Sequence, residues 1–181
     1  MHLQGKRAFV TGATGFLGPY LVEALLKRGA QVTALVRRPI SPEAKALAAK
    51  GATLVEGDVT EVTTLEARGC DVFFHNAAVV GHGLTKRLRR HLFEVNVEGT
   101  RNALSAARRA GITRFVHTSS IAVIGDTRGE VADEGFPRNP WFRSYYEQSK
   151  LEAHLLVMGA EDLNPVLPMR PFGRRQSQVF A

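Results

Sequence analysis

Two adjacent tyrosines precede a lysine in the segment RSYYEQSK, residues 143–150. Tyr146 and Lys150 are four residues apart and share one face of a helix, whereas Tyr145 and Lys150 are five apart and do not. A lysine ammonium beside a phenol favours the phenolate and lowers its pKa from an unperturbed value of about 10. The spacing therefore predicts Tyr146 as a general acid or base. An isolated pair of this kind also fits a helix with a packed aromatic and a surface lysine. The choice between a catalytic and a structural pair therefore depends on the other motifs of the chain.

A glycine-rich turn, TGATGFLG, lies near the N-terminus, between an apolar run and a helical pattern. Its glycines have the spacing G-x-x-G-x-x-G, which a purely structural turn would also allow. Glycine permits a tight turn and lets backbone N–H groups and a helix N-terminus approach a pyrophosphate. We therefore expect a dinucleotide cofactor to contact this turn through Gly12, Thr14, Gly15, Phe16, Leu17 and Gly18.

The second apolar run ends in ALVRRP, where an NAD site usually offers an acidic residue to the ribose hydroxyls. Arg37 stands 19 residues after Gly18, close to the spacing of that acid. A guanidinium suits a 2′-phosphate through bidentate charge-assisted hydrogen bonds. Arg37 and Arg38 also fit ordinary surface residues, but the pattern favours NADP over NAD.

Strand and helix patterns alternate along the chain and would position these residues. The expected helices cover residues 16–29, 42–50, 87–110 and 143–159, and several end on a basic residue followed by glycine. The expected strands cover 7–12, 30–38, 52–60, 70–78 and 112–120, with a weak, proline-broken sixth at 164–171. Alternating elements with apolar strands predict a Rossmann-type, doubly wound parallel sheet with helices on both faces.

Composition is that of an ordinary globular domain, with 44% hydrophobic and 23% charged residues. The net charge of +7 comes from short basic clusters without interleaved aromatics, which we interpret as solvated helix faces rather than a nucleic-acid site. One cysteine, Cys70, excludes an intramolecular disulfide and fits a reducing cytoplasm. No membrane span, signal peptide or metal-ligand spacing is apparent, so we expect a cytoplasmic protein without a metal.

Taken together, the motifs resemble those of the short-chain dehydrogenase/reductase superfamily. TGATGFLG, GDVT at 57–60, HNAA at 75–78, NVEGTRN at 96–102, HTSS at 117–120 and YYEQSK occur in order. They are similar to the extended branch, which holds NAD(P)-dependent epimerases, dehydratases and dihydroflavonol-reductase-like enzymes. The resemblance covers residues 6 to about 172.

The resemblance implies a role for each matching residue. Tyr146 would be the catalytic acid/base, Lys150 would hold the nicotinamide ribose and lower the tyrosine pKa, and Ser120 would bind the substrate oxygen. Thr118 and Ser119 are alternatives to Ser120. Asp58 and Val59 match positions beside the adenine, and Ala77 and Ala78 match backbone that lines the cofactor. Asn96 matches a structural asparagine near the active site. Tyr145 would pack or line the substrate side, and the histidines at 75, 82 and 117 would be satisfied or exposed, without a mechanistic role.

The implied reaction is a hydride exchange between NADP, or NAD, and a carbon that bears a hydroxyl or carbonyl group. A nucleotide sugar, a ketone and a steroid-like alcohol all stay open as substrates. The alternative is a dinucleotide-binding module or sensor without catalysis. The resemblance also implies a homodimer formed by the helices near 90–110 and 143–159, with apolar positions at Leu92, Val95, Leu104, Leu151, Leu155 and Met158.

The C-terminal part departs from the family pattern. Extended-branch enzymes continue into a lobe that builds most of the substrate pocket, but here only 31 residues follow Lys150 (181 minus 150). We expect a nucleotide-binding domain over 1–172 and an irregular tail over 173–181, with the substrate lobe largely missing through truncation, frameshift or incomplete determination.

Overall fold

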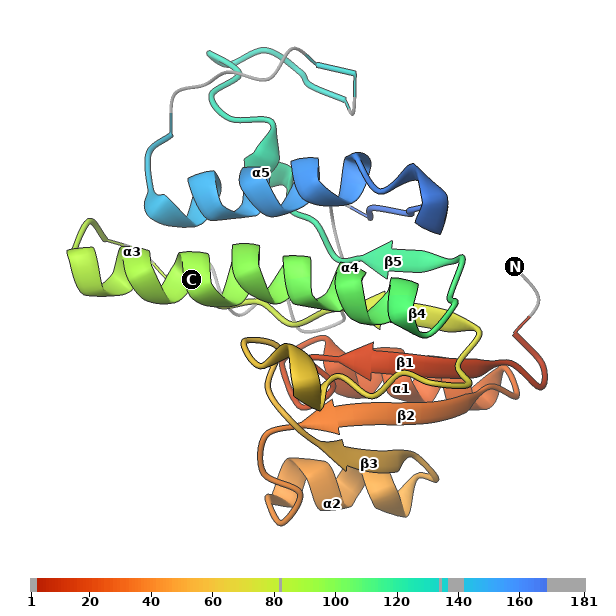
Figure 1. Cartoon of the computed structure of the whole chain (residues 1–181). Helices are drawn as coiled ribbons and strands as arrows, with labels where there is room; N and C mark the ends of the chain where they lie inside the picture. Colours follow the sequence, from red (N-terminus) through yellow and green to blue (C-terminus); the bar gives the residue numbers. More distant parts are fainter. Residues whose placement is uncertain (1–2, 82, 134, 137–141, 169–181) are drawn as a thin grey trace.

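A five-stranded parallel sheet forms the centre of the computed structural model, which describes residues 3–81, 83–133, 135–136 and 142–168. The strands are β1 (Arg7–Thr11), β2 (Gln31–Val36), β3 (Thr53–Glu56), β4 (Val72–His75) and β5 (Phe115–His117). Their order across the sheet is β3-β2-β1-β4-β5, and all point the same way (Figure 1). This is the strand order of a Rossmann-type sheet, so the predicted fold class is confirmed.

Five α-helices accompany the strands within the described ranges. They are α1 (Gly18–Lys27), α2 (Pro42–Ala49), α3 (Lys86–Phe93), α4 (Gly99–Arg109) and α5 (Tyr145–Met158). Helices α1 and α2 connect β1 to β2 and β2 to β3, α3 and α4 connect β4 to β5, and α5 follows β5. The helix predicted at 87–110 is interrupted, because a π-helical turn, η2 (Glu94–Glu98), joins α3 to α4. Such π turns are rare in proteins and occur often at functional sites.

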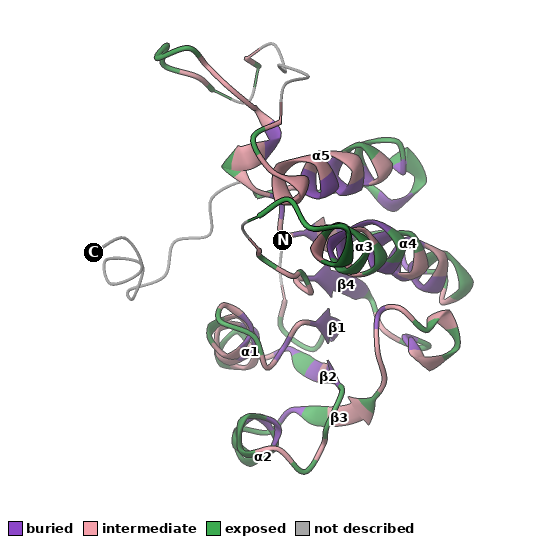
Figure 2. Cartoon of the chain, turned by 90° about the vertical axis from the view of Figure 1, so that its left-hand side faces the viewer, coloured by how far each residue is buried: buried purple, intermediate pink, exposed green. Residues whose placement is uncertain are grey.

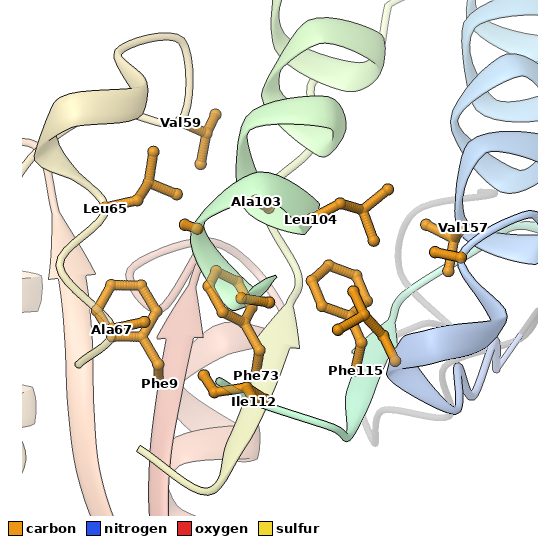
Figure 3. Close-up of a cluster of buried hydrophobic side chains, with 14 of the residues drawn as sticks. Phe9, Val59, Leu65, Ala67, Phe73, Ala103, Leu104, Ile112, Phe115 and Val157 are labelled. Carbon is orange, nitrogen blue, oxygen red and sulfur yellow. The ribbon is translucent and has the colours of Figure 1, made fainter. Parts of the chain in front are cut away.

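The two faces of the sheet bury different side chains. On β1, Ala8 and Val10 pack with α1 and α2, whereas Phe9 between them points to the opposite face. There Phe9, Phe73 and Phe115 lie in adjacent strands and pack with residues of α4 and α5 (Figure 3). Buried residues accordingly line the sides of the helices that face the sheet (Figure 2). This alternation is the period-two pattern of a sheet covered on both sides.

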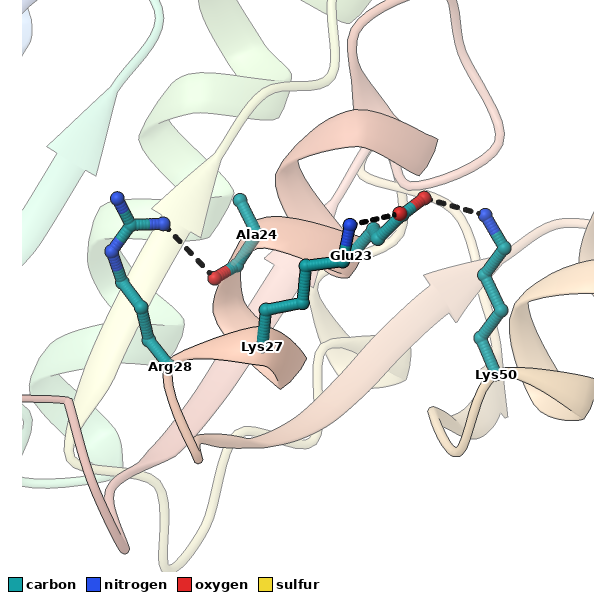
Figure 4. A network of polar contacts seen from close by, with 5 residues as sticks. All are labelled: Glu23, Ala24, Lys27, Arg28 and Lys50. Carbon is teal, nitrogen blue, oxygen red and sulfur yellow. Dashed lines mark hydrogen bonds and ion pairs between the residues drawn. The ribbon is translucent and has the colours of Figure 1, made fainter.

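Surface ion pairs join the first two helices. The carboxylate of Glu23 on α1 lies 2.7 Å from Lys27 Nζ, one turn along the helix, and 2.7 Å from Lys50 Nζ at the end of α2 (Figure 4). Hydrogen bonds from Lys27 and Lys50 lower the pKa of Glu23 to about 2. Since all three groups are solvent-exposed, these pairs add little stability.

The sixth strand predicted at 164–171 occurs only as a single bridge in the described part of the chain. Val166 pairs in parallel with Val116, where its carbonyl accepts from His117 N at 2.9 Å and its N–H donates to Phe115 O at 2.9 Å. The domain boundary predicted at 172/173 lies outside the described residues. In the described ranges, none of the helices has the length and apolarity needed to cross a membrane.

Candidate active site

Glycine is required at two positions of the turn that follows β1. Gly12 has a φ of +67°, and a Cβ there would lie 2.6 Å from Ala77 N. A Cβ on Gly18 would collide with the carbonyl groups of Gly12 and Ala13. Gly15 is exposed and less confined, with Gly12 O at 3.3 Å from its notional Cβ. The turn is therefore folded tightly against β4 and leaves its backbone near the carboxyl edge of the sheet.

The N-terminus of α1 is arranged to receive an anion. Serine or threonine side chains cap α2, α3 and α5, but no side chain caps α1 at Leu17 and no acid lies in its first turn. The N–H groups and positive dipole end of such a helix favour phosphate. Phe16 is exposed, while Thr14 and Leu17 are half-buried. These residues fit the pyrophosphate of a dinucleotide.

The predicted adenosine-side residues follow β2 and β3 at the same edge. Arg37 is exposed directly after β2, and no acid stands in its place. Asp58 follows β3, and its Oδ1 accepts from Thr60 N and Thr60 Oγ1 at 2.9 Å each. Val59 is buried, and its carbonyl accepts from Asn102 Nδ2 at 2.9 Å. The contacts of Asp58 and Val59 thus fix the loop after β3, while Arg37 and Arg38 are exposed to solvent after β2.

The segment after β4 is held by buried polar side chains. Ala77 N donates to Thr11 Oγ1 at 3.3 Å, while Ala78 is exposed. Asn96, in the π turn η2, accepts from Val79 N at 2.8 Å and donates to Val79 O at 3.0 Å. The same amide nitrogen donates to Ser149 Oγ on α5 at 3.0 Å. Asn96 thus fixes the loop beyond Ala77 and Ala78 and joins it to α5.

Lys150 is buried, which contradicts the alternative interpretation of the Tyr-Lys pair, in which the lysine lies on the surface. Only 2% of the residue is exposed, and its ammonium donates to Thr118 O at 2.9 Å, just beyond β5. Burial lowers the pKa of Lys150 to about 8. A desolvated ammonium at this edge gains from any acceptor or negative charge placed beside it, such as a ribose hydroxyl or a phenolate.

The two tyrosines have different neighbours. The ring of Tyr145 lies 5.7 Å from the guanidinium carbon of Arg89 on α3, so it packs between helices. Tyr146 is half-buried, one turn before Lys150 on α5. Ser120 begins the short 3-10 helix η3 (Ile121–Val123), which contacts α5, and its Oγ accepts from Ala122 N at 3.2 Å. Ser120 and Lys150 thus lie near the end of β5, and Tyr146 lies one turn before Lys150 on α5.

Ser119 and Thr118, the alternatives to Ser120, contact α5 in different ways. Ser119 Oγ is bonded to His154 Nδ1 at 2.9 Å in the protein interior, and Thr118 offers its carbonyl to Lys150. Their contacts connect β5 to α5 at two points. The hydroxyl of Ser119 is thus taken up by His154, whereas that of Ser120 accepts from Ala122 N within η3.

The buried histidines only partly follow the expectation. Both ring nitrogens of His75 are hydrogen-bonded, as a satisfied histidine requires. His117 stacks on His75 with ring centres 5.4 Å apart, and neither of its ring nitrogens has a partner among the described residues. Burial and the charge of Lys150 lower the pKa of His75 to about 3 and that of His117 well below its usual value. Position 82 lies outside the described residues.

The family model of the NAD dependent epimerase/dehydratase family matches residues 8–173. The chain belongs to this family. A 3-beta-hydroxysteroid dehydrogenase of Mycolicibacterium neoaurum is 38% identical over 177 residues, and a putative dihydroflavonol 4-reductase of Synechocystis is 39% identical over 175. These matches cover 92% and 91% of this chain, but 47% and 49% of the relatives.

A solved structure supports the same placement. A short-chain dehydrogenase/reductase superfamily protein from Agrobacterium tumefaciens, determined with bound NAD, has a TM-score of 0.74 and 30% identity. The match covers 89% of this chain and 48% of that one, so this chain spans about half the length of the relatives it matches. The resemblance to the extended branch is confirmed, and the family is NAD-dependent.

The sequence did not single out four polar residues that connect the site, and it indicated His75 only as a satisfied or exposed histidine. The four are Thr11, Thr100, Ser149 and His154. Their signal would have been polar residues at positions where the periodicity requires burial, as at His75 within the strand VFFH. Within the described ranges, no group of three or more histidine, cysteine or acidic residues could hold a metal ion.

Proposed function

We propose that this chain is the cofactor-binding and catalytic half of an NAD(P)-dependent oxidoreductase or epimerase of this family. The buried ammonium of Lys150, on the face of α5 that also carries Tyr146, is the observation that supports the proposal most. A buried ammonium with no carboxylate partner among the described residues is costly, and such groups concentrate at functional sites. A purely structural helix would place an apolar residue at this position.

Each residue has a distinct part in the proposed reaction. The N-terminus of α1 and the glycine turn bind the pyrophosphate, and Lys150 holds the ribose. Bound at this edge, the nicotinamide supplies the hydride chemistry. Tyr146 gives or takes the proton of the substrate oxygen, Lys150 stabilises its phenolate form, and Ser120 orients and polarises the same oxygen.

For the substrate, we propose an alcohol or ketone on an apolar ring system. The support is the recurrence of hydroxysteroid dehydrogenase and reductase names among relatives that align with over nine-tenths of this chain. Calorimetric titration with NAD and NADP tests binding, and absorbance at 340 nm with a 3β-hydroxysteroid and oxidised cofactor tests turnover. Cofactor binding without turnover of any alcohol or ketone would favour the binding-module alternative, and no binding would refute the proposal.

We also propose NADP as the preferred cofactor, with Arg37 as the residue that recognises the 2′-phosphate. Arg37 is exposed directly after β2, the strand next to the one that leads into the glycine turn, and the guanidinium fork suits a phosphate. The titration above ranks the two cofactors directly.

A homodimer is the proposed assembly, but its support comes from α5 alone. Leu155 and Met158 are 48% and 47% exposed there, whereas Leu92 and Leu104 lie in the core. Any contact made by α4 would therefore use its charged outer face. Light scattering at micromolar concentration tests the assembly, and a monomer would contradict it.

A further inference from the structure

A continuous chain of hydrogen bonds runs through the interior from the glycine turn to α5. It begins at Thr11, the last residue of β1, whose Oγ1 lies 2.9 Å from His75 Nδ1. His75 Nε2 lies 3.0 Å from Thr100 Oγ1 on α4, and Thr100 donates to Asn96 O at 2.6 Å. From Asn96 the contacts branch to Val79 and Ser149, and Ser149 Oγ donates to Tyr146 O at 2.8 Å. Most of these side chains are buried: Thr11, His75, Asn96, Thr100 and Ser149 are at most 1% exposed.

The donors and acceptors of this chain assign one tautomer to His75. The only hydroxyl proton of Thr100 goes to Asn96 O, so Thr100 Oγ1 must accept from His75 Nε2–H. Because burial keeps His75 neutral, its Nδ1 is then an acceptor for the hydroxyl of Thr11. Thr11 Oγ1 is left to accept from Ala77 N, as observed. With this tautomer, every donor from Ala77 N to Thr100 has an acceptor, and no two donors face each other.

The ends of the chain lie at the two parts of the proposed site. Ala77 is cofactor-lining backbone beside Gly12, and Tyr146 is the proposed acid/base. A buried polar network that is fully satisfied is rigid, whereas a partly satisfied one costs free energy. We infer that His75 and Thr100 are positioning residues that hold the cofactor-lining segment after β4 and the start of α5 in one fixed relation. The catalytic meaning of this inference rests on the proposed function, but the mechanical coupling does not.

The coupling is tested on the whole chain without substrate, by amide hydrogen exchange followed by NMR. Thr100→Val keeps the shape of the side chain but deprives His75 Nε2–H of its acceptor. Leaving a buried donor unpaired costs enough to raise local opening about tenfold, so we expect exchange at Ala77 and Lys150 to accelerate by that factor. Thr100→Ser should restore the rates, and Thr33→Val, in β2 and outside this chain of hydrogen bonds, should leave them unchanged. Acceleration confined to α4, or none at all, would overturn the inference.

Ser149→Ala is the milder variant, since alanine favours the helix. It should accelerate exchange at Lys150 but not at Ala77, because the links of Asn96 to Val79 and Thr100 persist. An unchanged Lys150 rate would overturn the inference even if Thr100→Val fails to fold. Histidine-selective ¹⁵N NMR should show His75 as the neutral Nε2–H tautomer; an Nδ1–H tautomer would also overturn it.

Turnover measurements connect the coupling to catalysis. We expect Ser149→Ala to lower kcat about tenfold with a 3β-hydroxysteroid while cofactor affinity is kept, and Thr100→Val to weaken both, since displaced catalytic groups lose rate steeply. If the parent chain shows no turnover, the proposed function fails while the exchange rates still decide the coupling. Normal kcat in variants whose exchange is accelerated would refute the positioning role alone.

Discussion

The two halves of the carboxyl edge are built differently. Beyond β1, β2 and β3, the proposed cofactor half relies on backbone geometry, with confined glycines, an uncapped helix N-terminus and the exposed Arg37. Beyond β4 and β5, the proposed catalytic half relies on buried polar side chains, such as Asn96 and Lys150. Pyrophosphate binding needs close approach of the backbone, whereas proton transfer needs side chains whose pKa and position are controlled.

This difference has an energetic counterpart. A pKa of about 8 for Lys150, against an ordinary 10.5, corresponds to a desolvation cost of about 3 kcal/mol for the ammonium at neutral pH. The exposed ion pairs of Glu23 carry no comparable cost. In the proposed catalytic half, the buried ammonium of Lys150 thus costs free energy of folding. A bound cofactor or substrate that offered it a hydrogen-bond acceptor would offset that cost.

The largest effect should come from removing one oxygen in the catalytic half. We expect Tyr146→Phe to lower hydride transfer by roughly 10²–10⁴-fold, the usual contribution of general acid–base catalysis, while cofactor affinity stays nearly intact. Single-turnover absorbance at 340 nm and calorimetric titration measure the two quantities.

Tyr145→Phe is the matched control, because the ring of Tyr145 packs beside Arg89 and only that ring is invoked. Its turnover should stay within a few-fold of the parent, an order-of-magnitude expectation for a variant without a role in proton transfer. An inactive Tyr145→Phe beside an active Tyr146→Phe would show that the shared helix face of Tyr146 and Lys150 has been misassigned.

The second-largest expected effect is a loss of folding stability in acid, caused by two buried histidines of the catalytic half, His75 and His117. His75 and His117 have folded pKa values far below the value near 6.5 expected in the unfolded chain. Below pH 6.5 the unfolded chain binds protons at these histidines that the folded chain does not, so their contribution to stability is present above that pH and is lost as the pH falls. For His75 this loss continues to about pH 3. Each histidine should contribute about 1.4 kcal/mol per pH unit within this window.

Urea unfolding at several pH values measures this slope. His117→Phe should flatten it, because His117 is buried without a hydrogen-bond partner in the described ranges and phenylalanine cannot be protonated. His91→Gln replaces an exposed histidine and serves as the control. An identical slope in the parent and in His117→Phe would contradict the assignment of the acid sensitivity to this site.

In the cofactor half, one added methyl group at Gly18 should disturb the glycine turn. Gly18→Ala would place a Cβ against the carbonyl groups of Gly12 and Ala13. We therefore expect the free energy of unfolding to fall by about 1–3 kcal/mol and the affinity for the cofactor to fall with it. Gly15→Ala, whose Cβ meets only Gly12 O at 3.3 Å, should cost less. Thermal unfolding and calorimetry distinguish the two variants, and equal losses would contradict the confinement of Gly18.

The features of the cofactor half could be predicted from the sequence, whereas several features of the catalytic half could not. The glycine turn and the alternating strands are local patterns, so their positions and the fold class followed from the sequence. The π turn at 94–98 did not, because a single inserted residue hardly changes the apolar periodicity of a helix. The partners of His75 and the burial of Lys150 are contacts between distant segments, which no spacing along the chain encodes.

The smallest predicted effect is a change of cofactor preference at Arg37. An exposed guanidinium contributes to phosphate binding through charge-assisted hydrogen bonds of about 1.5–3 kcal/mol in favourable cases, and solvent screens part of that. We therefore expect the parent chain to favour NADP by about tenfold, and Arg37→Asp to narrow or reverse this preference by repelling the 2′-phosphate and accepting from a ribose hydroxyl. Arg38→Asp is the matched control, since it changes the net charge equally one residue further from β2. If both variants shift the preference alike, the effect is one of overall charge and Arg37 does not recognise the phosphate directly.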